Sequence, residues 1–179
     1  EIASGSGSFL NRQLVVLASG HFTIDAYSSF FLPLLPLLTQ RLGLNYAMVG
    51  GLTAMASMSS SFSQPLFGLW ADRLRRPWFV VLGPLIAAVF MSSMGLATSY
   101  AGLVALLVFG GIGVAMFHPQ TASLAGASSP RRGLAMSFWV TGGTLGWALG
   151  PAYATAIVNR FGLEHTWYAS VPGLVLCAL

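Results

Sequence analysis

The residues best able to do chemistry are Asp25 and His21, which lie near the middle of an apolar run from Leu14 to Leu38. A carboxylate at the centre of a membrane-crossing helix costs about 2.5–3.5 kcal/mol. Such a residue is kept where it faces water or a partner group, and it is by default a proton or ligand site. His21 precedes Asp25 by one helical turn and Ser28 follows on the same face. One side of this helix is therefore predicted to line a water-filled cavity.

The composition is that of a protein that crosses a membrane several times. Of the 179 residues, 55% are hydrophobic and 7% are charged, whereas a soluble domain has about 25% charged residues. The basic residues are all arginines and cluster in short loops, where they report topology. We therefore expect a lipid bilayer as a partner and no nucleic acid. The single cysteine, Cys177, has no second cysteine for an internal disulfide.

The apolar segments predict an all-α, polytopic membrane protein. The predicted spans are about 14–38, 46–70, 78–97, 100–124, 134–158 and 167–179. At about 1.5 Å per residue the last segment covers roughly 20 Å of a 30 Å hydrocarbon core, so we expect a truncated helix there. Residues 1–8 are rich in Gly and Ser and are expected to be a linker or fusion scar, or else a natural flexible tail, before a bundle over 9–179.

The arginines also predict the orientation of the chain. One group precedes the first span or lies in the loops after spans two and four, and the other lies in the loops after spans one and five. The first group is Arg12, Arg73, Arg75, Arg76, Arg131 and Arg132, and the second is Arg41 and Arg160. Positive charge favours the cytoplasmic side, so a cytoplasmic amino terminus in the inner (plasma) membrane is expected.

Small and polar residues form stripes on two spans, and such stripes allow close approach of helices. On span two we favour helix packing for Gly50, Ala54, Ser57, Ser61, Gln64 and Gly68. On span five the packing motif is Gly142, Gly146 and Gly150, followed by Pro151. The opposite face of span five suits a polar cavity wall and carries Ser137, Thr141 and Thr144.

The loop after span two reads Gly68-Leu-Trp-Ala-Asp72-Arg73-Leu-Arg75-Arg76. It resembles the signature loop of the major facilitator superfamily, although Arg75 stands where that family usually has glycine. Asp72 is expected to pair with an arginine or to cap a neighbouring helix, as a charge latch that can make and break. The resemblance implies a gating loop of Gly68, Asp72, Arg73 and Arg76.

Two further segments carry the resemblance. The run from Gly142 to Pro151 is similar to the fifth-span motif of drug-efflux members, with Ala154 and Thr155 in place of its final glycine pair. Phe117-His118-Pro119, together with His21, Asp25 and Gln64-Pro65, resembles the fosmidomycin-resistance group. That group usually has an acid where this chain has Gln120, and many proton-coupled efflux members have an arginine where it has Leu107.

The resemblance implies a fold of twelve helices in two bundles, of which this chain would be the amino-terminal six-helix half, built from two inverted three-helix repeats. Spans one and four then line the central cavity, and His21 and His118 are expected to share a depth. The implied partners are the missing carboxy-terminal six-helix bundle or a second copy, a small-molecule substrate and protons.

These considerations assign roles to individual residues. Asp25 and His21 are expected to couple protons, and His118 to contact substrate beside a helix broken or kinked at Pro119. Further substrate contacts are expected at Gln120, Trp139 and Thr141.

Several kinds of site are not expected. The three histidines are far apart in sequence, and His165 beside Glu164 is predicted to be a solvated pair. No nucleotide loop or nucleophile–base arrangement is visible. We therefore expect no metal site, no cofactor, no catalytic residues and no enzyme activity.

The predicted function is half of a secondary active transporter, with proton-linked efflux of a small molecule or drug by alternating access. Two alternatives stay open. Leu107 and Gln120 favour weaker proton coupling, as in a facilitator or an uptake symporter. The linker-like start and short last span are also compatible with a non-transporting membrane scaffold or engineered half-bundle.

Overall fold

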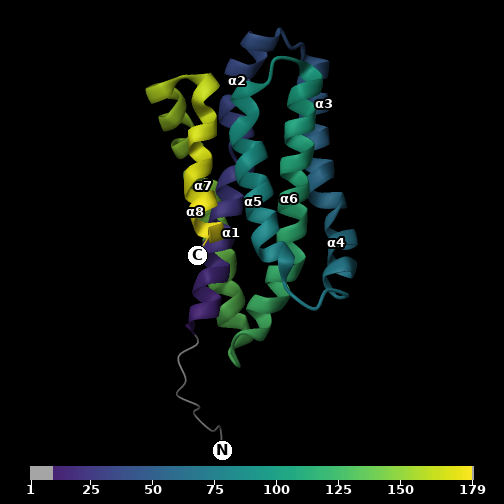
Figure 1. Cartoon of the computed structure of the whole chain (residues 1–179), viewed down its shortest axis with the longest axis vertical. Coiled ribbons are helices and arrows are strands. Elements are labelled where there is room, and N and C mark those ends of the chain that lie inside the picture. The colour runs from purple at the N-terminus through teal and green to yellow at the C-terminus, as the bar shows by residue number, and fades with distance from the viewer. Residues whose placement is uncertain (1–9, 179) are drawn as a thin grey trace, which may run out of the picture.

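The computed structural model describes residues 10–178, and within that range the chain is helical and has no strand (Figure 1). The expected linker at residues 1–8 lies outside the described residues. The helices, in chain order, are α1 (Arg12–Ser28), α2 (Phe31–Leu42), α3 (Tyr46–Ser57), η1 (Met58–Phe62), α4 (Gln64–Ala71), α5 (Trp78–Ser92), η2 (Ser93–Leu96), α6 (Tyr100–Ala127), α7 (Arg132–Phe161), η3 (Leu163–Ser170) and α8 (Val171–Ala178).

The first apolar run is two helices and not one. α1 ends at Ser28, and α2 begins at Phe31. Pro33 has no N–H to continue the ladder of α1, but it fits the first turn of a new helix, where that N–H would have no partner. At the break, the Ser29 hydroxyl donates to the Ala26 carbonyl at 2.7 Å. The prolines thus interrupt the run just after the polar face that carries Asp25.

The second span also departs from a regular helix. Between α3 and α4 the chain makes the π-helical turn η1. Pro65 follows, and its ring cannot sit against the carbonyl four residues earlier in an α-helix. Widening the turn accommodates this proline, and π turns of this kind are frequent at functional sites.

Glycines hold the two most extensive helix pairs, α1 with α7 and α5 with α6, at very close range. A Cβ on Gly142 would lie 2.6 Å from the Ala18 carbonyl oxygen, and one on Gly146 would overlap the Phe22 carbonyl. In the α5–α6 pair, a Cβ on Gly113 would lie 2.7 Å from the Gly83 carbonyl oxygen. Backbones this close exclude any side chain at these positions.

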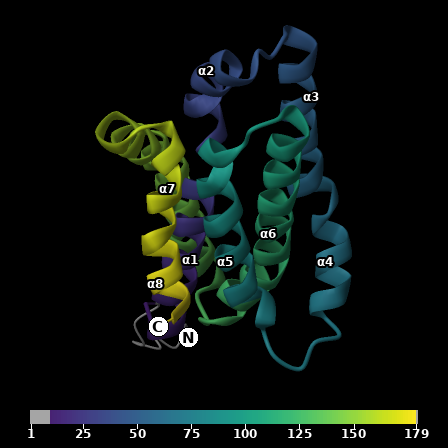
Figure 2. The ribbon, with the colours of Figure 1, turned by 45° about the horizontal axis from the view of Figure 1, so that its top comes forward.

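The helix pairs show the inverted repeat of the fold. α1 packs on α7, and α6 packs on the segment formed by α3, η1 and α4 (Figure 2). In an inverted repeat, span one corresponds to span four and span two to span five. The contact of span one with span five is then equivalent to the contact of span four with span two. α1 and α6 therefore occupy matching central places in the bundle.

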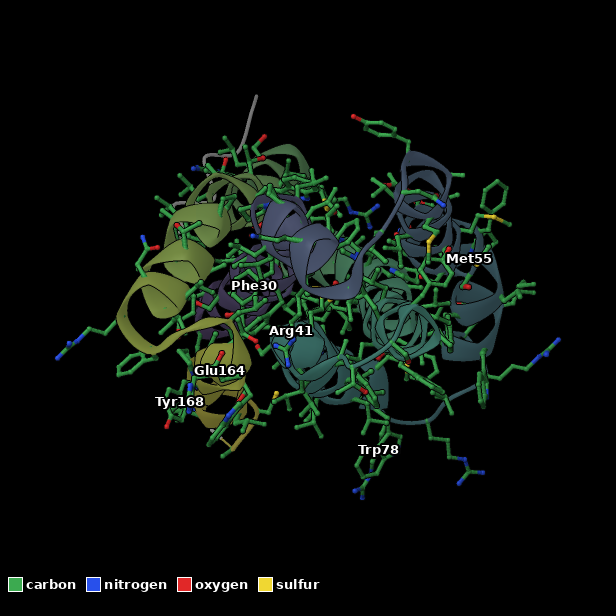
Figure 3. The ribbon with its side chains drawn as sticks, turned by 90° about the horizontal axis from the view of Figure 1, so that it is seen from above. Phe30, Arg41, Met55, Trp78, Glu164 and Tyr168 are labelled. Atoms are coloured by element: carbon green, nitrogen blue, oxygen red, sulfur yellow. The ribbon has the colours of Figure 1, made fainter. Side chains whose placement is uncertain are left out.

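The outside of the bundle is apolar. In the end-on view Phe30 lies inside and is 1% exposed, whereas Trp78 lies on the rim and is 54% exposed (Figure 3). Among the described residues, three helical stretches have the length and apolarity to cross a membrane, and the first of them comprises α1 and α2. These are Arg12–Leu42, Trp78–Leu96 and Tyr100–Ala127. α7 has 30 residues but is less apolar, because it carries several glycines and threonines and has arginines near both ends.

The last segment differs from the prediction at its start. The chain after Gly162 forms the 3₁₀ helix η3 before α8 begins at Val171. Thr166 fixes η3 by accepting a hydrogen bond from the Gly95 N–H at 3.1 Å. Trp167, predicted to open the sixth span, therefore lies in this connecting turn.

Replacing Gly146 with alanine is expected to destabilise the protein by about 1–3 kcal/mol, because the added methyl group forces α7 away from the Phe22 carbonyl. The matched control is Gly133→Ala on the same helix, where a Cβ meets no atom within 4 Å. That change should be neutral or stabilising, because alanine favours helix over glycine. Thermal unfolding of the purified protein in detergent measures both, and equal midpoints would contradict the close-packing account.

Candidate functional site

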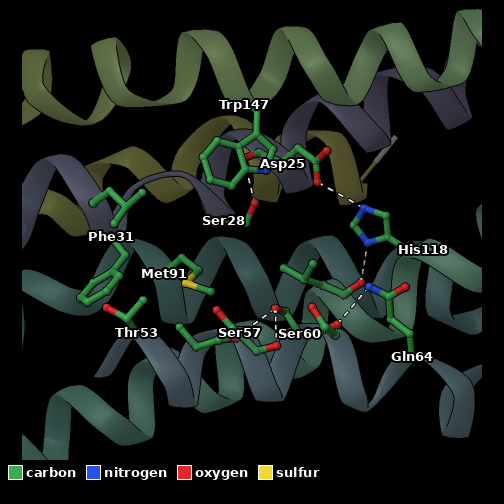
Figure 4. Close-up of a pocket in the computed structure, with 14 residues that line it drawn as sticks. Asp25, Ser28, Phe31, Thr53, Ser57, Ser60, Gln64, Met91, His118 and Trp147 are labelled. Carbon is green, nitrogen blue, oxygen red and sulfur yellow. Dashed lines mark hydrogen bonds and ion pairs between the residues drawn. The ribbon is translucent and has the colours of Figure 1, made fainter. Parts of the chain in front are cut away.

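The candidate site is a cluster in which the Asp25 carboxylate lies between the imidazoles of His21 and His118; Figure 4 shows Asp25 with His118. Asp25 Oδ2 lies 3.3 Å from His21 Nε2, one turn earlier on α1. Asp25 Oδ1 lies 3.2 Å from His118 Nε2 on α6. The side chains of His21, Asp25 and His118 are 7%, 12% and 20% exposed. The inverted repeat has thus brought together two histidines that are far apart in sequence.

Both imidazoles are oriented by backbone carbonyls. His21 Nδ1 lies 2.8 Å from the Trp139 carbonyl oxygen, and His118 Nδ1 lies 2.8 Å from the Val114 carbonyl oxygen. A carbonyl oxygen only accepts hydrogen bonds, so each Nδ1 must carry the hydrogen. In the neutral form each Nε2 then has a lone pair, and both lone pairs face Asp25. The cluster is complete only when a proton or another cation lies between these acceptors.

Trp139 and Gly143, both on α7, hold His21 in place. The indole stacks on the His21 ring with centroids 3.8 Å apart and an interplanar angle of 22°. Its Nε1 is buried without a hydrogen-bond partner among the described residues, so the indole meets the cluster through ring contacts, stacked on His21 and edge-on to His118. A Cβ on Gly143 would lie 2.5 Å from His21 Nε2 and 2.6 Å from Asp25 Oδ2. Glycine there leaves room for the ion pair.

The cluster opens into a cavity of about 390 Å³ that is lined by residues of each helix from α1 to α7 and of η1 (Figure 4). Asp25 is the one acid and His118 the one histidine among its lining residues, and no arginine lines it. Most of the polar lining consists of hydroxyl and amide groups: Ser28, Thr53, Ser57, Ser60, Ser61 and Gln64. The cavity therefore offers many hydrogen bonds and a single ionisable cluster.

Sequence comparison supplies the family. Residues 17–179 match the profile described as Major Facilitator Superfamily. The chain belongs to the major facilitator superfamily. Among its relatives, the "Fosmidomycin resistance protein" of Escherichia coli (strain K12) is 29% identical over 168 residues, and the "Uncharacterized MFS-type transporter YfnC" of Bacillus subtilis (strain 168) is 26% identical over 168 residues. The "Multidrug resistance protein MdtG" of Escherichia coli (strain 55989 / EAEC) is 29% identical over 173 residues.

These alignments cover 93% of this chain but only 41–42% of each relative. The chain thus spans about two fifths of the length of these major facilitator proteins. Its helices account for one of the two bundles of the superfamily fold, and the predicted half-bundle of inverted repeats is confirmed.

Three residues expected to contact substrate lie elsewhere. Gln120 is buried, and its Oε1 accepts a hydrogen bond from the Phe79 N–H at 3.0 Å, so it satisfies an unpaired donor at the start of α5. Thr141 is exposed away from the cavity, and its hydroxyl bonds the Ser137 carbonyl of its own helix at 2.8 Å. Trp139 supports His21 and does not line the cavity. Of the predicted substrate contacts, His118 alone lines it.

The helix around His118 is also more regular than expected. α6 runs without a break from Tyr100 to Ala127, through Pro119. The Thr121 hydroxyl bonds the Phe117 carbonyl at 2.7 Å, close to the turn where the proline removes a backbone donor. The helix is therefore not broken at Pro119, and the alternative, a kink there, stays a prediction; His118 is placed by a continuous helix.

Most of the small-residue stripe on span two is a cavity wall, whereas Gly68 at its end packs on α6, where a Cβ would lie 3.5 Å from the Pro119 side chain. Ser57, Ser61 and Gln64 line the cavity, and a Cβ on Gly50 would meet nothing within 4 Å. The neighbouring face makes the close contact instead, since a Cβ on Gly111 would overlap the Ser59 hydroxyl. Polar spacing alone could not decide between these two faces, because small polar residues suit both.

The loop after α4 forms a second hollow with α6. Its lining includes Gly68, Asp72, Arg75 and Arg76 together with Gln120, but not Arg73. Asp72 follows the last turn of α4 and is exposed. Every ion pair in the described range joins a histidine to a carboxylate, so the expected pairing of Asp72 with an arginine is absent there.

Two of the cavity residues that sequence reasoning missed carry large side chains from other helices. Trp147 and Met91 line the cavity, from α7 and α5. Trp147 falls inside the glycine-rich run, one position after Gly146, and its type alone indicates packing or an interface anchor. The signal that would have found it is its place on the helix relative to Gly146, whose contact with Phe22 turns the next residue towards the cavity side.

A cysteine at position 57 should react with a charged maleimide at least about tenfold faster than one at position 59, because thiolate chemistry needs access to water. Ser57 is exposed on the cavity wall, whereas Ser59 is 9% exposed against α6. Both substitutions are made in a Cys177→Ser background, and the labelling rate is measured in membranes. Similar rates at the two positions would mean that no aqueous cavity follows this wall.

Proposed function

We propose that this bundle is the amino-terminal half of a secondary transporter that couples substrate movement to protons through Asp25, His21 and His118. The observation that carries the proposal is the carboxylate held between two imidazole acceptors at the edge of a polar cavity. A central intramembrane acid is costly, and its retention at a cavity supports a functional role. The family, and relatives named for drug resistance, support transport.

The mechanism follows from the hydrogen bonds of the cluster. Because both Nδ1 atoms are committed to backbone carbonyls, protons arrive at and leave from Nε2 and the carboxylate. A proton bound there satisfies the acceptors, and a substrate that binds the same groups competes with it. When a second six-helix bundle rocks against this one, the cavity opens alternately to each side of the membrane. A proton taken up on one side can then be exchanged for substrate on the other.

The names of the relatives support efflux, and the charge of the cavity wall limits the class of substrate. Two of the relatives are named for resistance to fosmidomycin and to multiple drugs. The cavity wall of this half supplies hydroxyl and amide groups and no fixed cation. An anionic substrate would therefore be bound by protonated histidine or by the other bundle.

The orientation in the membrane follows from the arginines. The loops before α5 and α7 and the start of α1 lie at one end of the bundle, opposite the loop between α2 and α3 (Figure 1). The first end carries Arg12, Arg73, Arg75, Arg76, Arg131 and Arg132. By the positive-inside rule, this end, which includes the start of α1, is expected to face the cytoplasm of a protein in the inner membrane.

A facilitator or uptake symporter is the second candidate, and two buried residues favour it. Leu107 is fully buried in the apolar core and Gln120 is engaged with the start of α5. Neither provides an additional ionisable group, so Asp25 is the one acid of this cavity. The discriminating property is whether a pH gradient alone moves substrate against its concentration gradient.

Asp25→Asn should reduce proton-driven transport by more than about tenfold, because the amide has a similar shape but takes up no proton. The assay uses the complete transporter in proteoliposomes, an imposed pH gradient and fosmidomycin as the probe. Exchange of fosmidomycin at equal pH on both sides should persist in the variant.

The matched control is Glu164→Gln, an exposed acid that pairs with His165 at 3.6 Å, far along the chain from the cavity. It should transport like the unmodified protein. Full gradient-driven accumulation by Asp25→Asn would remove this carboxylate from coupling. Wild-type protein that only equilibrates fosmidomycin would instead favour the facilitator.

A further inference from the structure

Three side chains converge with the composition of a metal site. One ligand atom from each of His21, Asp25 and His118 lies within 4.8 Å of the other two. Two imidazole nitrogens and a carboxylate oxygen are a donor set used for Zn²⁺ and similar divalent ions. Spacing in sequence excluded such a site, but α1 and α6 bring the donors together.

The Nε2 lone pairs of both histidines also point towards Asp25. Each histidine commits its Nδ1 hydrogen to a backbone carbonyl at 2.8 Å, which leaves Nε2 free to bind an ion. Metal-binding histidines characteristically donate their other ring hydrogen in this manner, and that bond fixes the ring. The His21 and His118 rings meet nearly perpendicular, at 82°, with centroids 5.0 Å apart. Both Nε2 atoms can therefore face one point beside Asp25.

The distances suit a small divalent ion. A tetrahedral Zn²⁺ with bonds of about 2.0–2.1 Å holds its ligand atoms about 3.3–3.4 Å apart. His21 Nε2 lies 3.3 Å from Asp25 Oδ2, which matches one such edge, and His118 Nε2 lies 3.2 Å from the other carboxylate oxygen, Oδ1. The remaining distance is the one between the two Nε2 atoms. Movement of the His118 ring, which is 20% exposed, can shorten it. The stacked His21 ring stays fixed on Trp139.

Charge favours a cation as well. The three groups bring one carboxylate and two nitrogen lone pairs together, and no other described residue forms an ion pair with Asp25. We propose that His21, Asp25 and His118 form a binding site for one divalent transition-metal ion of the Zn²⁺ class, with its fourth position open to the cavity. The ion would bridge α1 and α6 and exclude protons from the cluster.

The proposal depends on the geometry of the cluster and not on transport. It is tested by calorimetric titration of Zn²⁺ into the complete, chelator-treated transporter in detergent, and by the visible absorption of tetrahedral Co²⁺. One ion should bind per molecule, raise the midpoint of thermal unfolding and give the tetrahedral spectrum. Absence of a one-to-one site in the wild type would overturn the proposal.

Variants locate the site. His118→Gln removes a ligand, and Asp25→Asn replaces the carboxylate with an amide of similar shape. Each should weaken Zn²⁺ binding by more than about tenfold. Loss of a hydrogen-bond partner behind a ligand already costs about that much affinity, and loss of a ligand should cost at least as much. Gly143→Ala should also weaken it, because its methyl group would lie against His21 Nε2 and Asp25 Oδ2 without removing a donor.

Two controls match these changes. His165→Gln removes an exposed histidine that is bonded to the Phe161 carbonyl, and Gly133→Ala adds a methyl group in open space. Both should bind Zn²⁺ like the wild type, and gel filtration without metal checks that every variant is folded. Equal binding by His118→Gln and Asp25→Asn would place the ion elsewhere. Lost Zn²⁺ binding does not bear on proton coupling, which the gradient assay tests separately.

Discussion

The arrangement on which the rest of the site depends is the Asp25 carboxylate held between two Nε2 atoms whose rings are already bonded at Nδ1. A carboxylate facing two nitrogen lone pairs is stable only with a cation between them. The bundle supplies none as a fixed side chain, because no arginine lines the cavity. The cluster is therefore built to receive a mobile positive charge from water or from a ligand.

Close helix packing sets the position of this cluster. Gly142 and Gly146 bring α7 against α1, and Gly143 leaves space for the His21–Asp25 pair. The same approach stacks Trp139 on His21 and delivers its carbonyl to Nδ1. The glycine-rich run thus has two effects, since it joins helices and orients the ionisable group. A side chain at Gly143 would disturb the chemistry of the site as well as the packing.

Sequence alone predicted the parts of the site that lie within one helix. His21 and Asp25 are one turn apart, so their shared face follows from helical periodicity. Contacts between helices were less accessible. The family resemblance placed His118 at the same depth as His21, but the hydrogen bond of Gln120 to Phe79 and the outward direction of Thr141 depend on how neighbouring helices are rotated. Small polar residues suit a packing surface and a cavity wall equally well. The sequence therefore could not show that the serines of span two line the cavity.

The central claim is tested most directly by ¹⁵N NMR of histidine-labelled protein, with His21 and His118 assigned by substitution of each residue. The account predicts that in both neutral rings Nδ1 carries the hydrogen and Nε2 carries the lone pair. Hydrogen on Nε2 with a bare Nδ1 in the neutral rings would contradict it, because the carbonyl bonds that aim both rings at Asp25 would then be absent.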